Sequence, residues 1–267
     1  MINTISFEKL GLEFTINRAA FSIGSFSIYW YGIIIAFGLI LAVLYGMNEI
    51  KKSDISSDDF FNMLIISIPS AIIGARLYYV IFSWEQYADN IMSVFDIRSG
   101  GIAIYGGIIA TAIVILIYCS KKKINIGSVL DILAVGLLIG QCVGRWGNFV
   151  NGEAFGGETM LPWAMTIKNN GKIVAENVHP TFLYESLWNF IGIFALLFYK
   201  RIKNFNGEIF CAYMVWYGAG RTIIEGLRSD SLYLGFLRVS QIVSLCALIA
   251  GLILIIYNRK KLQKAAR

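Results

Sequence analysis

Long apolar runs separated by short polar segments dominate the chain. Each run is close to the roughly 20 residues that an α-helix needs to cross the hydrocarbon core of a bilayer. The runs predict seven helices, at about 28–47, 60–82, 102–120, 129–149, 181–200, 207–225 and 239–257. The pattern therefore predicts a polytopic membrane protein whose membrane body is all-α, with residues 1–267 forming a single integral membrane domain.

The longest connection, residues 150–180, lies between the fourth and fifth predicted helices. Within it, WAMTIKNNGKIVAEN (163–177) has two short runs with β-propensity on either side of Asn-Asn-Gly. Asn and Gly accept the positive φ angles of tight hairpin turns, so this segment predicts a β-hairpin. We expect residues 150–180 to form a small head outside the membrane.

Composition supports the membrane assignment, and the charge distribution orients the chain. The chain is 57% hydrophobic and 15% charged, whereas soluble domains are about a quarter charged. The net charge of +6 comes largely from basic groups at 51–52, 121–123, 200–203 and 259–267. Each group ends an apolar run, as cytoplasmic loops do under the positive-inside rule. This predicts an external N-terminus, a cytoplasmic C-terminus and no nucleic-acid partner.

The polar residues that interrupt the apolar pattern gather at the predicted outer ends of the helices. GRWGNFVNGEAFGG (144–157) closes the fourth run, and the sixth run ends in a stripe at helical steps of 4, 4 and 3. Arg221 of that stripe lies about 21 Å along its helix, in the outer part of the core. The full set is Tyr31, Arg76, Tyr105, Arg145, Asn148, Asn151, Glu153, His179, Tyr217, Arg221, Glu225 and Arg228.

Ionisable side chains at membrane depth cost ~2.5–3.5 kcal/mol or more each, so they tend to mark a working cavity. Each also has a simpler interpretation: an arginine could pair with Glu153 or Glu225, the tyrosines could be interfacial aromatics, and His179 could be a loop histidine. Together, several arginines with fewer carboxylates favour an anion, and a planar guanidinium suits phosphate. Glycines such as Gly106 and Gly156 permit close backbone approach. The pattern predicts an outward-facing, arginine-lined, phosphate-sized site.

Four cysteines scattered through apolar segments and a single histidine give no metal-ligand spacing. We therefore expect neither a metal nor a cofactor. A transporter for an anionic solute is the alternative that also needs intramembrane arginines. It should place polar residues in both halves of the membrane, whereas here they concentrate on the outer side.

The segment GRWGNFVNGEAFG (144–156) closely resembles the signature of the phosphatidylglycerol–prolipoprotein diacylglyceryl transferase family. Six further segments resemble that family in the same order along nearly the whole chain. They are IYWYG (28–32), GARLYYV (74–80), RSGGIAIYGG (98–107), HPTFLYE (179–185), YGAGRTIIEGLR (217–228) and SQIVS (240–244). An ordered series of matches is far more specific than any single motif.

The resemblance implies an enzyme of the bacterial cytoplasmic membrane, with seven helices and a small external head. Members of the family transfer the diacylglyceryl group of phosphatidylglycerol to the lipobox cysteine thiol of a prolipoprotein signal peptide, releasing glycerol 1-phosphate. The implied partners are phosphatidylglycerol, prolipoprotein signal peptides and membrane lipids, and the active site faces the outer leaflet.

We assign the site residues two roles on this basis. The catalytic candidates are Arg221, Glu153, Glu225, Tyr105 and His179. The substrate-binding candidates are Arg145, Asn148, Asn151, Tyr31, Tyr217, Arg76, Gly106 and Gly156. Tyr105 stands where some members carry a histidine, and a phenol with a pKa of about 10 is a poor base at neutral pH. The identity of the base therefore stays open among Glu153, Glu225 and His179.

Overall fold

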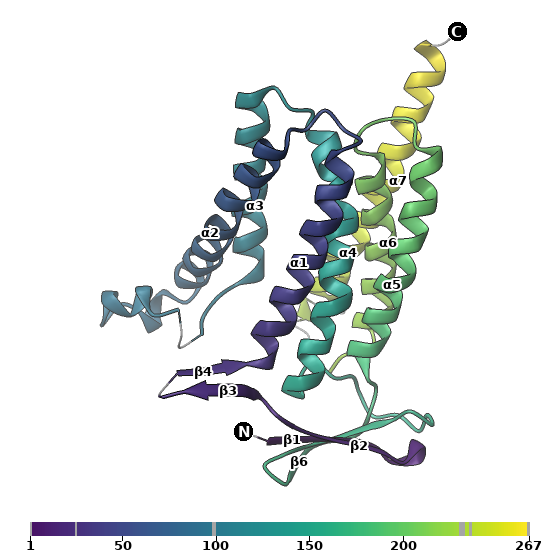
Figure 1. Cartoon of the computed structure of the whole chain (residues 1–267). Helices are drawn as coiled ribbons and strands as arrows, with labels where there is room; N and C mark the ends of the chain where they lie inside the picture. Colours follow the sequence, from purple (N-terminus) through teal and green to yellow (C-terminus); the bar gives the residue numbers. More distant parts are fainter. Residues whose placement is uncertain (1, 25, 98–99, 230–232, 235–236, 266–267) are drawn as a thin grey trace. The chain divides into compact units, whose positions relative to one another are not determined.

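The computed structural model describes residues 2–24, 26–97, 100–229, 233–234 and 237–265 (Figure 1). The chain divides into two compact units. One consists of Met1–Gly46 with Leu130–Arg267, and the other of Met47–Val129. Each unit is described by itself.

Seven α-helices form the bulk of the described residues and confirm the seven predicted helical segments. They are α1 Trp30–Ile50, α2 Ser57–Phe82, α3 Ile104–Lys122, α4 Ile126–Asn151, α5 Thr181–Tyr199, α6 Glu208–Glu225 and α7 Val239–Ala265. In the described chain, six are long and apolar enough to cross a membrane, and α6 is the one outside that set. The protein is therefore a mostly helical, multi-pass membrane protein.

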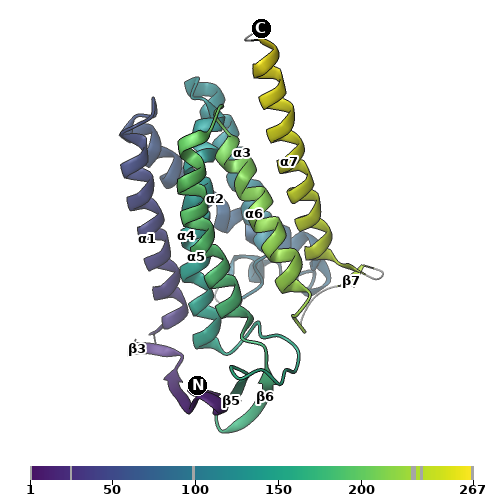
Figure 2. The same ribbon diagram turned by 90° about the vertical axis from the view of Figure 1, so that its right-hand side faces the viewer.

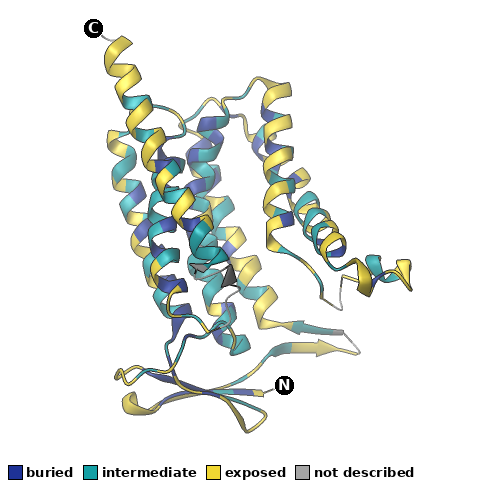
Figure 3. Cartoon of the chain, turned by 180° about the vertical axis from the view of Figure 1, so that it is seen from behind, coloured by how far each residue is buried: buried dark blue, intermediate teal, exposed yellow. Residues whose placement is uncertain are grey.

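Many residues of these helices are exposed (Figure 3), and large apolar residues are numerous among them. Examples with exposed side chains are Phe37, Leu44, Ile65, Ile81, Ile113 and Ile253. Exposed apolar faces of this extent are expected where lipid, not water, surrounds a helix, because lipid tails are as apolar as the side chains that face them. The pattern agrees with the membrane assignment made from composition.

Helices α4, α5, α6 and α7 lie side by side in the first unit (Figure 2). A core of buried side chains joins α4, α5 and α6: Ala134, Val135, Leu138, Leu196, Ile209 and Tyr213. This core fixes α6 between its neighbours although α6 carries three charged residues, Glu208, Arg221 and Glu225. The residues near its end, Tyr217 to Glu225, are held within the same bundle.

A four-stranded antiparallel sheet lies at the end of α4 and the start of α5 (Figure 1). Its order is β2-β1-β5-β6, from Leu12–Asn17, Ile2–Phe7, Met165–Asn169 and Lys172–Val178. The predicted hairpin is confirmed as β5 and β6, with positive φ at Asn170 and Gly171 in the turn. The pairing of β1 with β5 was not predicted, since it joins residues 3–6 to 166–169.

A buried apolar cluster attaches this sheet to the helices. It includes Ile5 of β1, Ile167 of β5, Phe149 of α4 and Phe182 of α5. Two shorter hairpins complete the described structure. One pairs β3 Ala19–Ile23 with β4 Phe26–Tyr29 before α1, and the other pairs β7 Tyr233–Leu234 with β8 Leu237–Arg238 before α7. Short 3-10 helices connect other elements at Glu8–Leu10, Trp84–Gln86, Ile91–Phe95 and Lys200–Ile202.

Asp131 of α4 caps the first turn of α6. Its carboxylate accepts the backbone N–H groups of Gly207, Ile209 and Phe210 at 3.0, 2.9 and 3.1 Å, and it pairs with Lys203 at 3.1 Å. The first N–H groups of a helix have no partner within the helix, so a carboxylate placed there satisfies them. Asp131 thus ties the start of α6 to α4.

Glu208, the first residue of α6, is fully buried and forms a second group of hydrogen bonds at this end of the helix. It accepts Arg259 Nε at 2.6 Å, the Tyr199 hydroxyl at 2.9 Å and the Asn204 N–H at 2.6 Å. The sequence predicted few unusual polar residues at this end of the helices. The structure shows a buried polar cluster here as well, and its hydrogen bonds connect α6 to α7 and to the segment after α5.

Candidate functional site

The buried carboxylate of Glu185 lies at the centre of a group of arginines. Glu185 is 4% exposed and stands in the second turn of α5. It forms an ion pair with Arg145 of α4 and another with Arg221 of α6, at 2.7 Å from Nη1. Arg228, just beyond α6, approaches the same carboxylate at 3.9 Å. One glutamate therefore joins three arginines from two other parts of the chain.

Glu225 provides a second carboxylate for the same group. Its Oε2 lies 2.7 Å from Arg221 Nη2, one helical turn earlier on α6. The arginine–glutamate cluster, defined as Arg145, Arg221, Arg228, Glu185 and Glu225, thus has three positive and two negative groups, a net charge of +1. A buried cluster that brings three guanidinium groups together is suited to a bound anion.

The cluster forms because neighbouring helices run in opposite directions. Arg145 is near the end of α4, Glu185 near the start of α5 and Arg221 near the end of α6. The prediction that Arg145 and Arg221 lie at the same end of the bundle is confirmed, since Glu185 contacts both arginines. The helical stripe on α6 is confirmed for Tyr217, Arg221 and Glu225, whereas Arg228 follows the helix in a turn.

Asn148, Asn151 and Glu153 form a polar extension of the cluster. Arg145 Nη1 donates to Asn148 Oδ1 at 3.3 Å, and Asn148 Nδ2 donates to Glu153 Oε1 at 3.0 Å. Asn151 Nδ2 donates to the same oxygen at 3.2 Å. The exposed Glu153 is therefore linked to Arg145 through Asn148, while Glu185 and Glu225 make the direct ion pairs with the arginines.

Gly156 lies where three segments meet. Its N–H donates to the His179 carbonyl at 2.9 Å, and the adjacent Gly157 N–H donates to the Leu227 carbonyl at 2.8 Å. A Cβ at Gly156 would overlap His179 Cβ and the Leu227 carbonyl. Glycine is needed here for the close approach of the chain after α4, before α5 and after α6. Its role in substrate binding stays a prediction.

His179 has aromatic neighbours. Its Nδ1 lies 3.2 Å from the Tyr184 hydroxyl, which also accepts Trp163 Nε1 at 2.7 Å. The imidazole is thus part of a group that joins the segment between α4 and α5 to the first turn of α5. Its action as a base stays a prediction.

Two predicted tyrosines contact the helices that carry the arginines. The Tyr31 ring of α1 packs on Gly147 of α4, two residues after Arg145. Tyr217 stacks on Tyr213 along α6, with ring centroids 5.6 Å apart. Both rings therefore lie next to elements of the cluster, in keeping with the substrate-binding role predicted for them.

Arg76, Tyr105 and Gly106 belong to the second unit. Arg76 is 5% exposed, and its guanidinium lies 5.0 Å from the Tyr87 ring centroid. It donates to the carbonyls of Ser93, Val94, Asp96, Gly100 and Gly101 at 2.7–2.9 Å. Through these hydrogen bonds Arg76 holds the segment between α2 and α3 in its conformation. Whether it also binds substrate stays a prediction.

Gly106 and Tyr105 stand at the start of α3. A Cβ at Gly106 would overlap the Gly74 carbonyl and Tyr78, so Gly106 permits α2 and α3 to pack closely. Tyr105 is exposed. Their participation in one site with the arginine–glutamate cluster stays a prediction.

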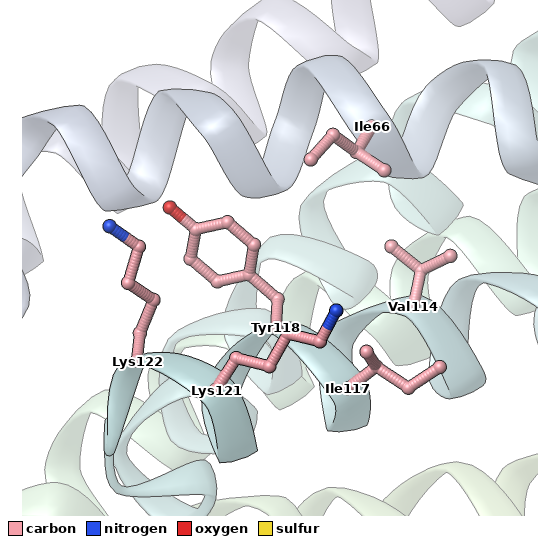
Figure 4. Close-up of a pocket in the computed structure, with 6 residues that line it drawn as sticks. All are labelled: Ile66, Val114, Ile117, Tyr118, Lys121 and Lys122. Atoms are coloured by element: carbon pink, nitrogen blue, oxygen red, sulfur yellow. The ribbon is translucent and has the colours of Figure 1, made fainter.

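A groove between α2 and α3 is a separate feature of the second unit (Figure 4). It measures about 270 Å³ and is lined by Ile66, Val114, Ile117, Tyr118, Lys121 and Lys122. It lies toward the lysine end of α3, far along the helix from Tyr105, and contains none of the predicted site residues. Within the described residues, no group of three His, Cys, Asp or Glu side chains is placed to hold a metal ion.

Glu185 and Arg228 were not among the site residues assigned from the sequence. Glu185 ends the segment HPTFLYE, and a lone carboxylate one turn inside an otherwise apolar helix was the signal that could have identified it. Arg228 was recognised as part of the stripe on the sixth segment but was given no role. Glu185 belongs to the site because it contacts Arg145 and Arg221 on other helices, and Arg228 belongs to it because it approaches Glu185.

Comparison with known proteins assigns a family to this arrangement. The family model for prolipoprotein diacylglyceryl transferase matches residues 18–257. A phosphatidylglycerol–prolipoprotein diacylglyceryl transferase of Finegoldia magna is 49% identical over 251 residues, covering 93% of this chain and 98% of the relative. Proteins of the same name from Clostridioides difficile and Streptococcus agalactiae serotype Ia are 45% and 46% identical, covering 92% of this chain and 96% and 97% of the relatives.

Proposed function

Because the chain belongs to the prolipoprotein diacylglyceryl transferase family, we propose that it transfers the diacylglyceryl group of phosphatidylglycerol to the lipobox cysteine thiol of a prolipoprotein. The products are a thioether-linked lipid on the protein and glycerol 1-phosphate. This would be the first step of bacterial lipoprotein maturation, and the chain would act as a transferase without a cofactor.

The observation that carries the proposal is the arginine–glutamate cluster with its net charge of +1. A guanidinium has five N–H donors, so it can hold a carboxylate on one edge and a phosphate on another. Glu185 and Glu225 fix the planes of Arg145 and Arg221, and a lipid phosphodiester would complete the charge balance. The arginines would then be oriented before the substrate arrives.

The reaction proposed for this site is a substitution at the glyceryl carbon that bears the phosphate ester. The cysteine sulfur forms a bond to that carbon while the carbon–oxygen bond to phosphate breaks. The electron pair leaves on the phosphate oxygen of glycerol 1-phosphate, and Arg145 and Arg221 stabilise the developing charge. The thiol, whose ordinary pKa is about 8.5, gives its proton to a base. Glu153, Glu225 and His179 remain the candidates for that base, and Tyr105 is a candidate for orienting the thiol.

We further propose that α6 is a seventh membrane span and that the site faces the outer leaflet of the bacterial cytoplasmic membrane. The core shared by α4, α5 and α6 supports a position of α6 inside the bundle. Basic segments follow α1, α3 and α5 and occupy the end of α7, which supports a cytoplasmic location for those ends under the positive-inside rule. The sheet with residues 150–180 would then be external, where signal peptides emerge.

The direct test is a transfer assay with purified protein, phosphatidylglycerol in mixed micelles and a lipobox peptide. The wild type should lipidate the peptide and release an equal amount of glycerol 1-phosphate. Arg145→Ala should reduce transfer by about a hundredfold or more, because one preorganised donor to a developing oxyanion contributes that much. Lys172→Ala, at an exposed lysine of β6, is the matched control and should retain wild-type turnover.

Two outcomes would contradict the proposal. Near-wild-type turnover by Arg145→Ala would remove the role of the cluster in catalysis. Uptake of an anionic solute into proteoliposomes, with no modification of the peptide thiol by the wild type, would instead favour the transporter alternative.

A further inference from the structure

Two tryptophans, Trp188 of α5 and Trp216 of α6, join their helices by reciprocal hydrogen bonds. Trp188 Nε1 donates to the Trp216 carbonyl at 3.0 Å, and Trp216 Nε1 donates to the Trp188 carbonyl at 3.1 Å. The two indoles are stacked, with ring centroids 4.7 Å apart and planes at 27°. Each tryptophan is therefore donor and acceptor for the other, and we call this arrangement the tryptophan clasp.

Two glycines make the tryptophan clasp possible. Gly192 follows Trp188 by one turn, and Gly220 follows Trp216 by one turn. A Cβ at Gly192 would overlap the Trp216 indole, and a Cβ at Gly220 would overlap the Trp188 indole. The side chain at i+4 stands beside the carbonyl of residue i in a helix. Glycine at that position therefore leaves the carbonyl open to an indole N–H from the other helix.

The clasp lies one turn from the ion pair that the proposed chemistry uses. Glu185 precedes Trp188 by one turn on α5, and Arg221 directly follows Gly220 on α6. The distance between Glu185 Oε1 and Arg221 Nη1 is 2.7 Å. Sliding α5 along α6 would distort both indole hydrogen bonds and this ion pair together. The register of the two helices and the geometry of Arg221 are thus set by the same contacts.

We propose that Trp188, Trp216, Gly192 and Gly220 are positioning residues for Arg221 and Glu185. They do not touch the reacting atoms. They fix the register of α5 against α6, so that the guanidinium plane of Arg221 is oriented before the phosphate binds. This inference rests on the proposed function for its kinetic consequence. Its structural part, the dependence of register on the two indole N–H groups, is independent of that function.

The experiment compares four variants in the transfer assay. Trp188→Phe and Trp216→Phe keep an aromatic ring and remove one N–H donor, while Gly192→Ala and Gly220→Ala push the indoles away. We expect kcat to fall by about tenfold or more for the glycine variants, since a displacement of about 1 Å at a reacting group can cost a hundredfold. The KM for phosphatidylglycerol should change by less than about twofold, because the interaction that is lost stabilises the transition state and not the bound substrate.

Gly251→Ala provides the matched control. A Cβ at Gly251 of α7 would approach the Cys211 carbonyl and the Val215 side chain of α6, so this variant disturbs the packing of α6 against α7, whereas the clasp joins α6 to α5. It should lower the midpoint of thermal unfolding without lowering kcat. A fall in kcat equal to that of Gly220→Ala would overturn the proposal, because general packing damage would then explain both.

A double variant and a spectroscopic readout complete the test. In Gly220→Ala with Trp188→Phe, the smaller ring makes room for the added methyl, so we expect part of the kcat lost in Gly220→Ala to return. The stacked indoles should give an exciton couplet in circular dichroism that Gly192→Ala and Gly220→Ala reduce. Unchanged couplets and unchanged kcat in both glycine variants would overturn the positioning role. A wild type without transfer activity but with a couplet that responds to these variants would contradict the proposed function alone.

Discussion

Glu185 is the residue whose surroundings explain most about the site. Its carboxylate is 4% exposed and contacts arginines on two other helices. A buried ion pair is costly to desolvate, and removing one partner leaves the other charge unpaired. Arg145 and Arg221 therefore depend on Glu185 for their charge balance as well as for their orientation. Glu153, in contrast, is exposed and contacts the arginines only through Asn148.

Glu185→Gln tests this difference at the residue scale. Glutamine keeps the shape of the side chain but removes the charge, so two arginines lose their shared partner. We expect transfer activity to fall by about a hundredfold and the free energy of unfolding to drop by ~3 kcal/mol. The variant should be measured in the transfer assay and by thermal unfolding in detergent.

Glu176→Gln, at an exposed glutamate of β6, is the control for the loss of a negative charge on the same unit. The activity of Glu153→Gln should lie between the activities of Glu176→Gln and Glu185→Gln, and its stability should equal that of the wild type. A Glu185→Gln variant with the stability and turnover of the wild type would show that the ion pairs to Arg145 and Arg221 are not needed.

At the scale of elements, α6 is held at both ends by polar contacts and in its middle by the tryptophan clasp. Asp131 caps its first turn, Glu208 pairs with Arg259 of α7, and Arg221 pairs with Glu185 of α5. The helix has charged residues near both of its ends, at Glu208, Arg221 and Glu225. Specific contacts with α4, α5 and α7 therefore define its position along the bundle in addition to apolar packing.

Asp131→Asn tests the contribution of the cap. The amide retains one acceptor oxygen and loses the charge that pairs with Lys203, so fewer N–H groups of the first turn of α6 are satisfied. We expect a loss of about 1–2 kcal/mol in the free energy of unfolding, as for other helix caps. Thermal unfolding in detergent measures it, with Asp58→Asn in the exposed first turn of α2 as the control. An equal loss in both variants would contradict a specific cap.

The elements show how far the sequence could predict the fold. The seven helices and the β5–β6 hairpin were predicted because apolar periodicity and an Asn-Asn-Gly turn are local signals. The pairing of β1 and β2 with that hairpin was not predicted, because residues 3–6 and 166–169 are far apart in the chain. Arg145 and Arg221 were predicted as site residues because a charged side chain at membrane depth costs free energy. Glu185 was missed because its importance arises only when α4, α5 and α6 lie together.

At the scale of the whole molecule, the number of membrane crossings determines which side of the membrane each segment occupies. Among the described residues, six helices are long and apolar enough to cross, and α6 differs by its polar stripe. The stripe of Tyr217, Arg221 and Glu225 lowers the apolar character of α6, and Arg221 and Glu225 of this stripe form ion pairs within the arginine–glutamate cluster. We therefore infer that α6 spans the membrane although its composition alone does not show it.

Cysteine accessibility on either side of α6 tests the seven-span topology. Arg201→Cys lies before α6 and Ser229→Cys after it, and both positions are exposed. With α6 as a span, a membrane-impermeant maleimide should label Ser229→Cys in intact cells and Arg201→Cys only after the membrane is opened. Lys172→Cys on the predicted external hairpin should label in intact cells, and the variants should be made in a background in which Cys119, Cys142, Cys211 and Cys246 are replaced by alanine.

The combination of these three positions separates the alternatives. Labelling of Arg201→Cys and Ser229→Cys on the same side would show that α6 does not cross the membrane. Labelling of Lys172→Cys only after permeabilisation would reverse the orientation, and would place the arginine–glutamate cluster, which adjoins the same sheet, on the cytoplasmic side. Since signal peptides present their lipobox outside the cytoplasm, that result would also contradict the transfer reaction proposed for the cluster.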